Sequence, residues 1–275
     1  MEISAEVPTK EQLEKYDRLK ACLKSFQSVA VAFSSGVDSA LLLYAAKEAL
    51  GEHAVAVTAV SGAFPKRELA EAKAFCAEHG ILQEIVEFRE MDVEGFRENP
   101  KNRCYLCKKA LFQEIRKAAA AHGIDTVAEG SNLDDLGDYR PGLTAIAELG
   151  IESPLRTSGL TKRDIRALSG YFGLPAWNKP SYACLASRFV YGETITREKL
   201  SMVDQAEQLL FDLGFSQFRV RIHGLLARIE VLPEEFPKLL ENRLRIVNTF
   251  KEYGFTYISM DLAGYRTGSM NETIL

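Results

Sequence analysis

The sequence predicts an α/β protein, in which helices cover both faces of a parallel sheet, followed by a smaller C-terminal α+β domain. Over the first two-thirds of the chain, short apolar runs alternate with helical patterns, which is typical of strand–helix–strand units. Beyond Val190 the expected strands follow one another directly, with fewer crossovers. We therefore place a domain boundary near Val190, which divides the chain into residues 1–190 and 191–275.

The elements of the first domain follow from local patterns. Thr9 and Gln12 form a capping-box pair at the start of the first helix. The apolar residues of that helix fall on one face: Leu13, Tyr16, Leu19 and Leu23. Strands are then expected at 29–33, 54–60, 81–86 and 126–129. Helices are expected at 40–50, 66–79, 108–122 and 161–170.

An irregular stretch, 174–196, leads into the second domain and contains Pro175 and Pro180. The elements expected after it are a helix at 198–213, strands at 217–223 and 227–232, a helix at 234–253 and a strand at 255–262.

Composition limits the function classes. The 275 residues carry 34 basic and 38 acidic side chains, a formal net charge of −4, so we expect no nucleic-acid partner, although a local basic patch would survive this average. No apolar run approaches the roughly 18 residues of a membrane span, and we expect a cytoplasmic protein without a membrane partner. Five cysteines, an odd number, fit reduced thiols in that compartment.

The segment 34–39, Ser-Ser-Gly-Val-Asp-Ser, lies between a buried strand and a helix and is predicted to cradle phosphate groups. A turn of small residues lets backbone N–H groups face an anion, and the helix N-terminus adds partial positive charge. Asp38 provides a carboxylate for Mg²⁺ that the phosphates carry. The alternative is an ordinary connection in which Ser34 or Ser35 caps the helix.

This segment lacks the GxxxxGK[ST] signature and resembles instead the pyrophosphatase loop, SGGxDS, of enzymes that split ATP into AMP and pyrophosphate. Ser35 departs from that pattern, since the family has glycine there. A turn that needs a positive φ is less favourable for serine than for glycine.

A second loop, Gly130-Ser131-Asn132-Leu133-Asp134-Asp135, follows a predicted strand and precedes the segment 137–142. If the alternation is right, both loops leave the same edge of the sheet. Its carboxylates could hold Mg²⁺ or position the loop, and Arg140 could neutralise charge on AMP. The alternative is a turn followed by a helix cap, which requires the same residue types.

Cys104 and Cys107 form a CxxC just before an Ala-rich helix, and Cys184 lies in the irregular stretch. Nearby cations would lower the thiol pKa values: Arg103, Lys108, Lys109 and Arg188. Three thiolates without a nearby histidine leave a zinc site short of a ligand, whereas three cysteines can hold a cubane iron–sulfur cluster with one open iron. A thioredoxin-like redox pair fits less well, because the CxxC is expected in a loop that starts a helix.

Period-two alternation in the strand after residue 217 places Arg219 and Arg221 on the face opposite Phe218, Val220 and Ile222. We expect the arginine face to be exposed, and two guanidinium groups at this spacing suit a phosphomonoester. The alternative is a solvated polar face of a half-buried strand.

Four segments together, 34–39, 130–142, 180–188 and 218–222, resemble the LarE family of ATP-dependent sulfur transferases, which act in nickel-pincer cofactor biosynthesis for lactate racemase maturation. The resemblance implies a Rossmann-like, adenine nucleotide alpha hydrolase-like fold. It implies that ATP adenylates a carboxylate of pyridinium-3,5-biscarboxylic acid mononucleotide with release of pyrophosphate, and that sulfur then displaces AMP to give a thiocarboxylate. Some members consume the cysteine matching Cys184, whereas others bind a 4Fe-4S cluster through three cysteines. This chain looks like the cluster type.

The resemblance also implies roles for individual residues. The catalytic residues are Asp38 and Cys184. The residues that bind ATP and Mg²⁺ are Ser34, Ser35, Gly36, Asp38, Ser39, Gly130, Asn132, Asp135 and Arg140. Those that bind the nucleotide substrate are Tyr105, Arg188, Arg219, Arg221 and Glu230, and the metal ligands are Cys104, Cys107 and Cys184. A sulfide donor and a homo-oligomer, a hexamer by resemblance, are the expected partners.

Three other functions share some of these features. A tRNA 2-thiolation enzyme has the same loop and often three cysteines, but its basic surface is not evident in the composition. A synthetase that uses ammonia would not need three thiolates. A nucleotide-binding sensor without enzymatic activity would need neither Cys184 nor the paired arginines.

Overall fold

The computed structural model describes residues 7–62, 64, 66–137, 141–178, 184–266 and 269. The chain divides into two compact units: the first comprises residues 1–61, 66–88 and 104–182, and the second comprises 62–65, 89–103 and 183–275. The second unit therefore draws a segment from the middle of the first two-thirds of the chain, in addition to the predicted C-terminal residues. The roles predicted for the domains 1–190 and 191–275 stay predictions.

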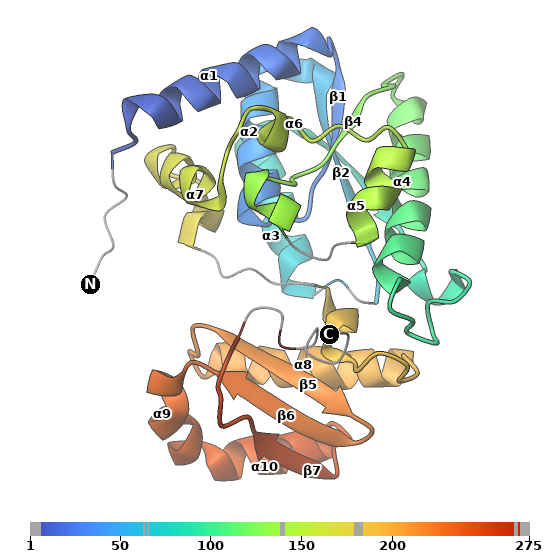
Figure 1. Cartoon of the computed structure of the whole chain (residues 1–275), viewed down its shortest axis with the longest axis vertical. Helices are drawn as coiled ribbons and strands as arrows, with labels where there is room; N and C mark the ends of the chain where they lie inside the picture. The colour runs from blue at the N-terminus through green and yellow to red at the C-terminus, as the bar shows by residue number, and fades with distance from the viewer. Residues whose placement is uncertain are drawn as a thin grey trace. The chain divides into compact units, whose positions relative to one another are not determined.

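The described part of the first unit contains a parallel sheet with the strand order β3-β2-β1-β4 (Figure 1). Its strands are β1 (Val29–Ala32), β2 (Ala54–Val60), β3 (Leu82–Glu87) and β4 (Val127–Ala128). Val31 lies opposite Ala56 on one side and Ala128 on the other, so β1 is a central strand. The α/β prediction is confirmed, because apolar runs buried on both faces are typical of parallel strands.

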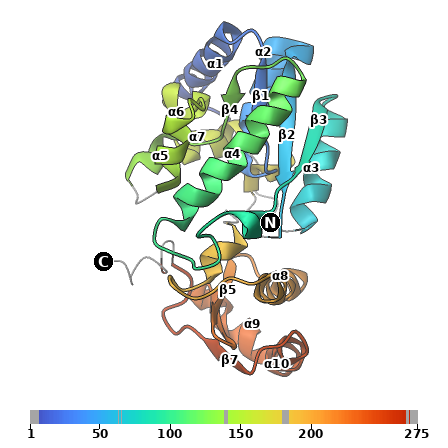
Figure 2. The ribbon, with the colours of Figure 1, turned by 90° about the vertical axis from the view of Figure 1, so that its right-hand side faces the viewer.

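Helices cover both faces of this sheet (Figure 1, Figure 2). They are α1 (Lys10–Ser25), α2 (Val37–Leu50), α3 (Lys66–Glu78), α4 (Arg103–Ala121), α5 (Pro141–Glu148), α6 (Pro154–Thr157) and α7 (Lys162–Tyr171). Val31 and Ala56 belong to a core cluster that includes residues of α1, α2, α3, α6 and α7. Their strand neighbours Ala30, Val55 and Val57 belong to a second cluster with residues of α4 and α5. Successive side chains along each strand thus point to opposite faces of the sheet and pack into two separate cores.

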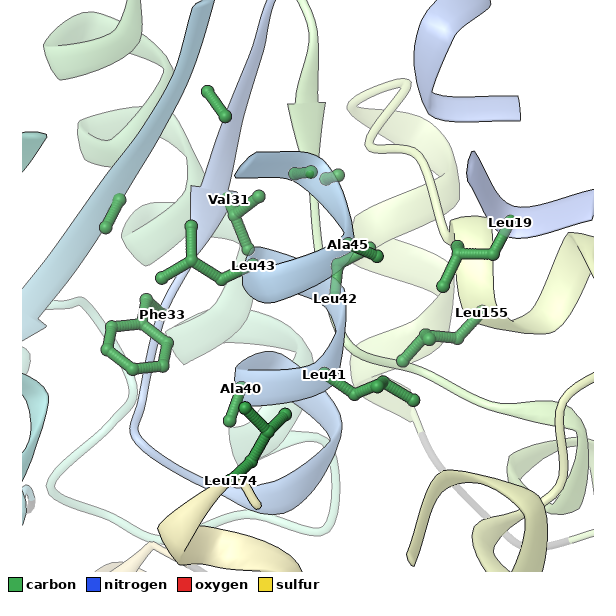
Figure 3. Close-up of a cluster of buried hydrophobic side chains, with 14 of the residues drawn as sticks. Leu19, Val31, Phe33, Ala40, Leu41, Leu42, Leu43, Ala45, Leu155 and Leu174 are labelled. Atoms are coloured by element: carbon green, nitrogen blue, oxygen red, sulfur yellow. The ribbon is translucent and has the colours of Figure 1, made fainter. Parts of the chain in front are cut away.

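Helix α2 lies at the centre of the first cluster and is apolar on most sides. Figure 3 shows Val31 and Leu43 between the strand and the helix, whereas Leu41 lies on the side of Leu155. A helix that is apolar all round is a buried helix. Because α2 is packed on most sides, the position of the loop that precedes it is fixed by the core.

The predicted capping box of α1 is present, with Thr9 and Gln12 exchanging side-chain and backbone hydrogen bonds. Leu13, which we predicted on the apolar face, is 38% exposed, whereas the other three apolar residues of that face are buried. Helix α4 begins at Arg103, earlier than predicted, and α5 and α6 were not expected from the sequence. Both begin with proline, which suits the first turn of a helix because proline has no N–H to leave unpaired.

In the second unit the described strands form a sheet with the order β5-β6-β7, in which β5 and β6 are antiparallel and β6 and β7 parallel. Its elements are α8 (Arg197–Asp212), β5 (Phe218–His223), β6 (Leu226–Val231), α9 (Phe236–Glu241), α10 (Arg243–Glu252) and β7 (Tyr257–Met260). The helix predicted at 234–253 is divided at Asn242. Its side-chain Nδ2 donates to the Lys238 carbonyl oxygen at 2.9 Å, and such back-bonding competes with the helical pattern.

Short 3₁₀ turns complete the described chain: Gly51–His53, Glu90–Asp92, Leu133–Gly137, Pro175–Asn178, Leu185–Arg188 and Pro233–Glu235. In the part of the chain that the structure describes, no helix has both the length and the apolar character needed to cross a membrane.

The segment 89–103 is tied to the loop after residue 184 within the second unit. Asn99 is fully buried with φ of 50°, and its Nδ2 donates to the Val190 carbonyl oxygen at 2.7 Å. The Arg103 guanidinium donates to Asn99 Oδ1 and to the Ala186 carbonyl oxygen, each at 2.6 Å. These bonds satisfy carbonyl groups that an irregular loop would otherwise leave unpaired.

Candidate active site

The predicted phosphate loop connects β1 to α2. Ser35 has a φ of 55°, so the residue at the unusual position of the motif adopts the left-handed conformation that favours glycine. Gly36 caps α2 with extended backbone (ψ of 158°) and without a side-chain bond. Ser39 Oγ accepts from the Ser34 N–H at 3.3 Å and donates to the Gly36 carbonyl oxygen at 3.1 Å. The loop is therefore a tight turn held from within, and the capping role weighed for Ser34 and Ser35 is not observed.

The second loop meets the first at the same edge of the sheet, as predicted, because β4 pairs in parallel with β1. A Cβ at Gly130 would lie 3.1 Å from the Ser39 nitrogen and 3.2 Å from Asp38 Cβ, so glycine permits this close approach. Asn132 Nδ2 donates to Asp38 Oδ1 at 3.1 Å. Residues far apart in the sequence thus converge on Asp38.

Lys162, which we did not predict, completes this arrangement. Its Nζ bonds to Asp38 Oδ2, and its backbone N–H donates to Asp134 Oδ2 at 2.8 Å. Lys162 is the first residue of α7 and follows the N-cap Thr161, whose capping box with Asp164 fixes the start of the helix. The capping box was a visible signal for the helix start, but no local pattern relates Lys162 to Asp38.

Two further carboxylates, Asp135 in the second loop and Glu129 directly before it, hold the loop in place. Asp135 is buried, and its Oδ2 accepts from the Asn132 N–H at 2.9 Å. Glu129 accepts from the Ser131 N–H at 3.0 Å, from Ser131 Oγ at 2.8 Å and from Ser153 Oγ at 2.6 Å. The bond from the Asn132 N–H gives Asp135 the turn-forming role that was the alternative to a metal-binding role. Arg140 lies outside the described residues.

Across the described ranges, no group of three or more His, Cys, Asp or Glu side chains is placed to hold a metal ion. Mg²⁺ is commonly bound through one or two protein carboxylates together with the phosphates of its nucleotide. The single carboxylate of Asp38 therefore fits Mg²⁺ that arrives with a nucleotide.

The cysteines of the CxxC lie inside α4 and not in a loop before it, which corrects the sequence-based expectation. Residues three apart share one side of a helix, so Cys104 and Cys107 are neighbours on its surface, and both are half-buried. Cys184 is exposed and belongs to the second unit, whereas the CxxC belongs to the first.

Tyr105, a predicted substrate residue, interacts with α5. Its hydroxyl donates to Glu148 Oε2 at 2.7 Å and accepts from Lys109 Nζ at 2.9 Å. The Lys109 ammonium, which we expected to act on the thiols, also pairs with Glu148 at 3.0 Å.

The two arginines of β5 are buried, so the prediction of an exposed Arg219 and Arg221 face is wrong. Arg219 is 4% exposed and Arg221 5% exposed. Period-two alternation does separate them from the apolar residues of β5, but acidic and aromatic side chains cover their face as well. The solvated-face alternative is wrong for the same reason.

Arg188 forms a buried pair with Glu207 of α8, with Nε and Nη2 donating to the two carboxylate oxygens at 2.7 and 2.9 Å. Burial favours the neutral forms of both groups, but their mutual attraction raises the pKa of Arg188 and lowers that of Glu207. Nη1 of Arg188 also donates to the Cys184 carbonyl oxygen at 3.5 Å, so this pair supports the Cys184 loop.

Arg221 and Glu230 form a second buried pair, with Nε and Nη2 donating to Oε2 at 3.1 and 3.0 Å. The Arg221 Nη1 group donates to the Ser187 carbonyl oxygen at 3.0 Å. Arg219 stacks its guanidinium 5.2 Å from the ring centre of Tyr265. Burial, and then the like charges of Arg188 and Arg221, lower the pKa of Arg219 to about 10, although the Glu207 carboxylate opposes this shift.

A parallel sheet whose first strand leads through a tight small-residue turn into a buried helix, beside a second loop at the same edge, defines a Rossmann-like protein of the pyrophosphatase-loop class. No family model matches the sequence. The chain is 36% identical over 257 residues to pyridinium-3,5-bisthiocarboxylic acid mononucleotide synthase of Lactiplantibacillus plantarum, covering 93% of each chain. The chain therefore belongs to the LarE family of sulfur-transferring enzymes.

Two further relatives have no described function. An uncharacterized protein of Synechocystis is 42% identical over 262 residues, covering 94% of this chain and 98% of the relative. An uncharacterized protein of Methanocaldococcus jannaschii is 28% identical over 265 residues, covering 93% of this chain and 98% of the relative. In all three comparisons the similarity extends over both compact units.

Proposed function

We propose that this enzyme is an ATP-dependent sulfur transferase that converts a carboxylate of pyridinium-3,5-biscarboxylic acid mononucleotide to a thiocarboxylate, a step in the maturation of lactate racemase. The observation that carries the proposal is Asp38, which the second loop holds at the phosphate turn, in a chain similar to a synthase of the bisthiocarboxylic acid mononucleotide.

In the first step a substrate carboxylate oxygen attacks the α-phosphorus of Mg²⁺-ATP. A new P–O bond forms and the bond to pyrophosphate breaks. The N–H groups of the loop and of the first turn of α2 stabilise the departing charge, and Asp38 binds the Mg²⁺ that accompanies it. Adenylation replaces an oxide leaving group by AMP, which makes the carbonyl reactive.

In the second step sulfide or a thiolate attacks the activated carbonyl carbon, a C–S bond forms and AMP leaves with the bonding electron pair. Arg188, Arg219 and Arg221 are the groups that we propose to bind the substrate's phosphomonoester in the second unit, because guanidinium groups bind phosphate through paired N–H donors. Glu230 would hold Arg221 in place for this contact.

For the sulfur source we propose a 4Fe-4S cluster with Cys104, Cys107 and Cys184 as ligands. Two half-buried thiols on one side of α4 and one exposed thiol in the Arg188 loop are suitable residue types. When bound, the cluster would supply an open iron for sulfide.

The exposure of Cys184 favours a second candidate, in which its own sulfur is transferred and dehydroalanine remains. Mass spectrometry after turnover separates the two sources. An unchanged polypeptide mass after repeated turnover supports sulfide delivery, whereas a loss of about 34 Da at Cys184, the mass of hydrogen sulfide, identifies the cysteine as the donor.

The experiment that tests the proposed function uses anaerobically purified protein, Mg²⁺-ATP and the biscarboxylic acid mononucleotide. We expect pyrophosphate release that depends on the mononucleotide and, with sulfide present, a product heavier by the exchange of oxygen for sulfur. Transfer RNA replaces the mononucleotide in a parallel reaction. Pyrophosphate release with transfer RNA alone would contradict the proposal and favour the tRNA 2-thiolation function.

A sulfide donor and assembly into a homo-oligomer, a hexamer by resemblance to the family, are also part of the proposal. Light scattering of the purified protein tests the assembly, and a fully active monomer at working concentration would contradict it.

A further inference from the structure

The Asp38 carboxylate is engaged on both oxygens. Oδ1 accepts from Asn132 Nδ2 at 3.1 Å, and Oδ2 bonds to Lys162 Nζ. The side chains of Lys162 and Asp38 are 29% and 22% exposed, so the pair lies at the surface of the site, where a ligand can reach it. An ammonium group thus occupies the carboxylate that the proposed function assigns to Mg²⁺.

We infer that Lys162 and Mg²⁺ exchange at Asp38 when nucleotide binds: Mg²⁺ takes the carboxylate, and the released ammonium binds a phosphate oxygen of ATP. This inference rests on the proposed function, because it assumes that Mg²⁺-ATP is the substrate. It makes Lys162 a nucleotide-binding residue of the adenylation step and Asp38 the point at which metal and nucleotide binding are coupled.

The exchange follows from charge and geometry. Two cations that share one carboxylate oxygen repel each other, and Mg²⁺ requires short contacts to its oxygen ligands in near-octahedral geometry. The Lys162 ammonium would therefore leave when the metal arrives. The negative phosphates that bring the metal provide a new partner for it, since lysine binds phosphate as a flexible point charge.

The backbone of Lys162 is fixed while its side chain can move. The Lys162 N–H donates to Asp134 Oδ2 at 2.8 Å, and the capping box of Thr161 and Asp164 secures the start of α7. The second loop, which supplies both Asn132 and Asp134, therefore holds Asp38 and Lys162 together. The ammonium on its four-carbon stem can turn from the carboxylate to a phosphate without any change in the loop or helix.

Binding of metal-free ATP, measured by calorimetry in EDTA, tests the exchange in a double-mutant cycle. Asp38→Asn releases Lys162, so this variant is expected to bind metal-free ATP at least about tenfold more tightly than the unaltered protein, the worth of one charge-assisted hydrogen bond. Lys162→Met is expected to bind it more weakly, and the double variant is expected to bind no more tightly than Lys162→Met. Lys162→Arg, which keeps the charge, should restore most of the affinity.

Asp38→Asn also removes a negative charge that repels ATP. The double variant separates this loss of repulsion from the release of Lys162. If the gain from Asp38→Asn persists with Met at 162, simple repulsion explains it and the exchange is overturned. It is also overturned if Lys162→Met leaves ATP binding unchanged. A matched control is Lys15→Met, which removes an ion pair of 2.8 Å to Asp164 at the same helix start and should leave ATP binding unaltered.

The two proposals fail differently. If the unaltered protein binds Mg²⁺-ATP and releases pyrophosphate but the cycle is additive, only the exchange is wrong. If the protein binds no ATP with or without Mg²⁺, the proposed function fails and the exchange fails with it. Thermal unfolding of every variant identifies any that lose ATP binding through loss of the fold.

Discussion

Ser35 has a positive φ in the turn of the phosphate loop. Its φ of 55° lies in the left-handed region, which disfavours a side chain with a Cβ. We expect Ser35→Gly to raise the free energy of unfolding by up to about 1 kcal/mol, as strain is relieved at the expense of a more flexible unfolded chain. Urea unfolding measures this difference. Ser34→Gly, at a neighbour without positive φ, should lower stability, and a loss of stability in Ser35→Gly would show that the turn is not strained.

The Asp38 side chain is 22% exposed, so its carboxylate contributes little to the packing of the core. Asp38→Asn keeps the bond from Asn132 but removes the charge that binds Mg²⁺, so pyrophosphate release should fall at least about 100-fold, the usual effect of losing one aimed electrostatic group. A coupled pyrophosphate assay measures the rate, and thermal unfolding should show a midpoint within a few degrees of the unaltered protein. Near-normal release would remove Asp38 from the mechanism.

At the scale of elements, Asp164 joins α1 to the start of α7. Its Oδ1 accepts from Gln12 Nε2 at 3.1 Å, and its Oδ2 accepts from Lys15 Nζ at 2.8 Å and the Thr161 N–H at 3.1 Å. Burial raises the pKa of Asp164, but these bonds outweigh it and lower the pKa to about 2. Because the pKa is lower in the folded state, the stabilisation is present above pH 4 or so and is lost as the pH falls toward about 2.

We therefore expect Asp164→Asn to reduce the free energy of unfolding by about 1 to 2 kcal/mol at pH 7. Chemical unfolding at a series of pH values should show the difference between variant and unaltered protein shrinking below pH 4 or so. A difference that is constant across this range would show that the charge of Asp164 does not contribute.

The pair of Arg188 and Glu207 connects α8 to the Cys184 loop. Both side chains are 1% exposed, and Glu207 also accepts from the Val220 N–H at 3.0 Å. Glu207→Gln leaves a buried arginine without its counter-charge and should cost about 3 to 5 kcal/mol of stability, measured by urea unfolding. Glu114→Gln, which breaks an exposed pair with Lys117, should change stability by less than about 1 kcal/mol. Equal effects of the two substitutions would contradict this account.

For the whole molecule, the important feature is that the second unit is not a continuous segment. Backbone and side-chain bonds connect 89–103 to 184–195, including Ile195 N–H to the Arg97 carbonyl oxygen and Gly192 N–H to the Asn99 carbonyl oxygen, each at 2.8 Å. We expect residues 183–275 expressed alone to unfold without a cooperative transition, because these partners are missing. Circular dichroism during urea unfolding tests this, with the full chain as the control. A sharp transition in the fragment would show that the segment 89–103 is dispensable.

Much of the fold could be predicted because its signals are local. Strand–helix alternation, the capping box at Thr9 and the turn residues at 34–39 each depend on neighbours within a few positions. The start of α4 was missed because the pattern of its first turn, Arg-Cys-Tyr-Leu-Cys, is not amphipathic enough to show a helix. The division at Asn242 was missed because a side chain competing with the backbone leaves no periodic signal.

The class of this protein follows from local patterns: apolar periodicity predicts the sheet and its helices, and small residues at the end of β1 predict the phosphate turn. Long-range packing determines which side chains meet, since Asp38 bonds to Asn132 and Lys162 across 94 and 124 residues of chain. It also determines that Arg219 and Arg221 are buried. The two kinds of information differ in range, because secondary structure arises from near neighbours, whereas an ion pair or a buried charge depends on how distant segments pack.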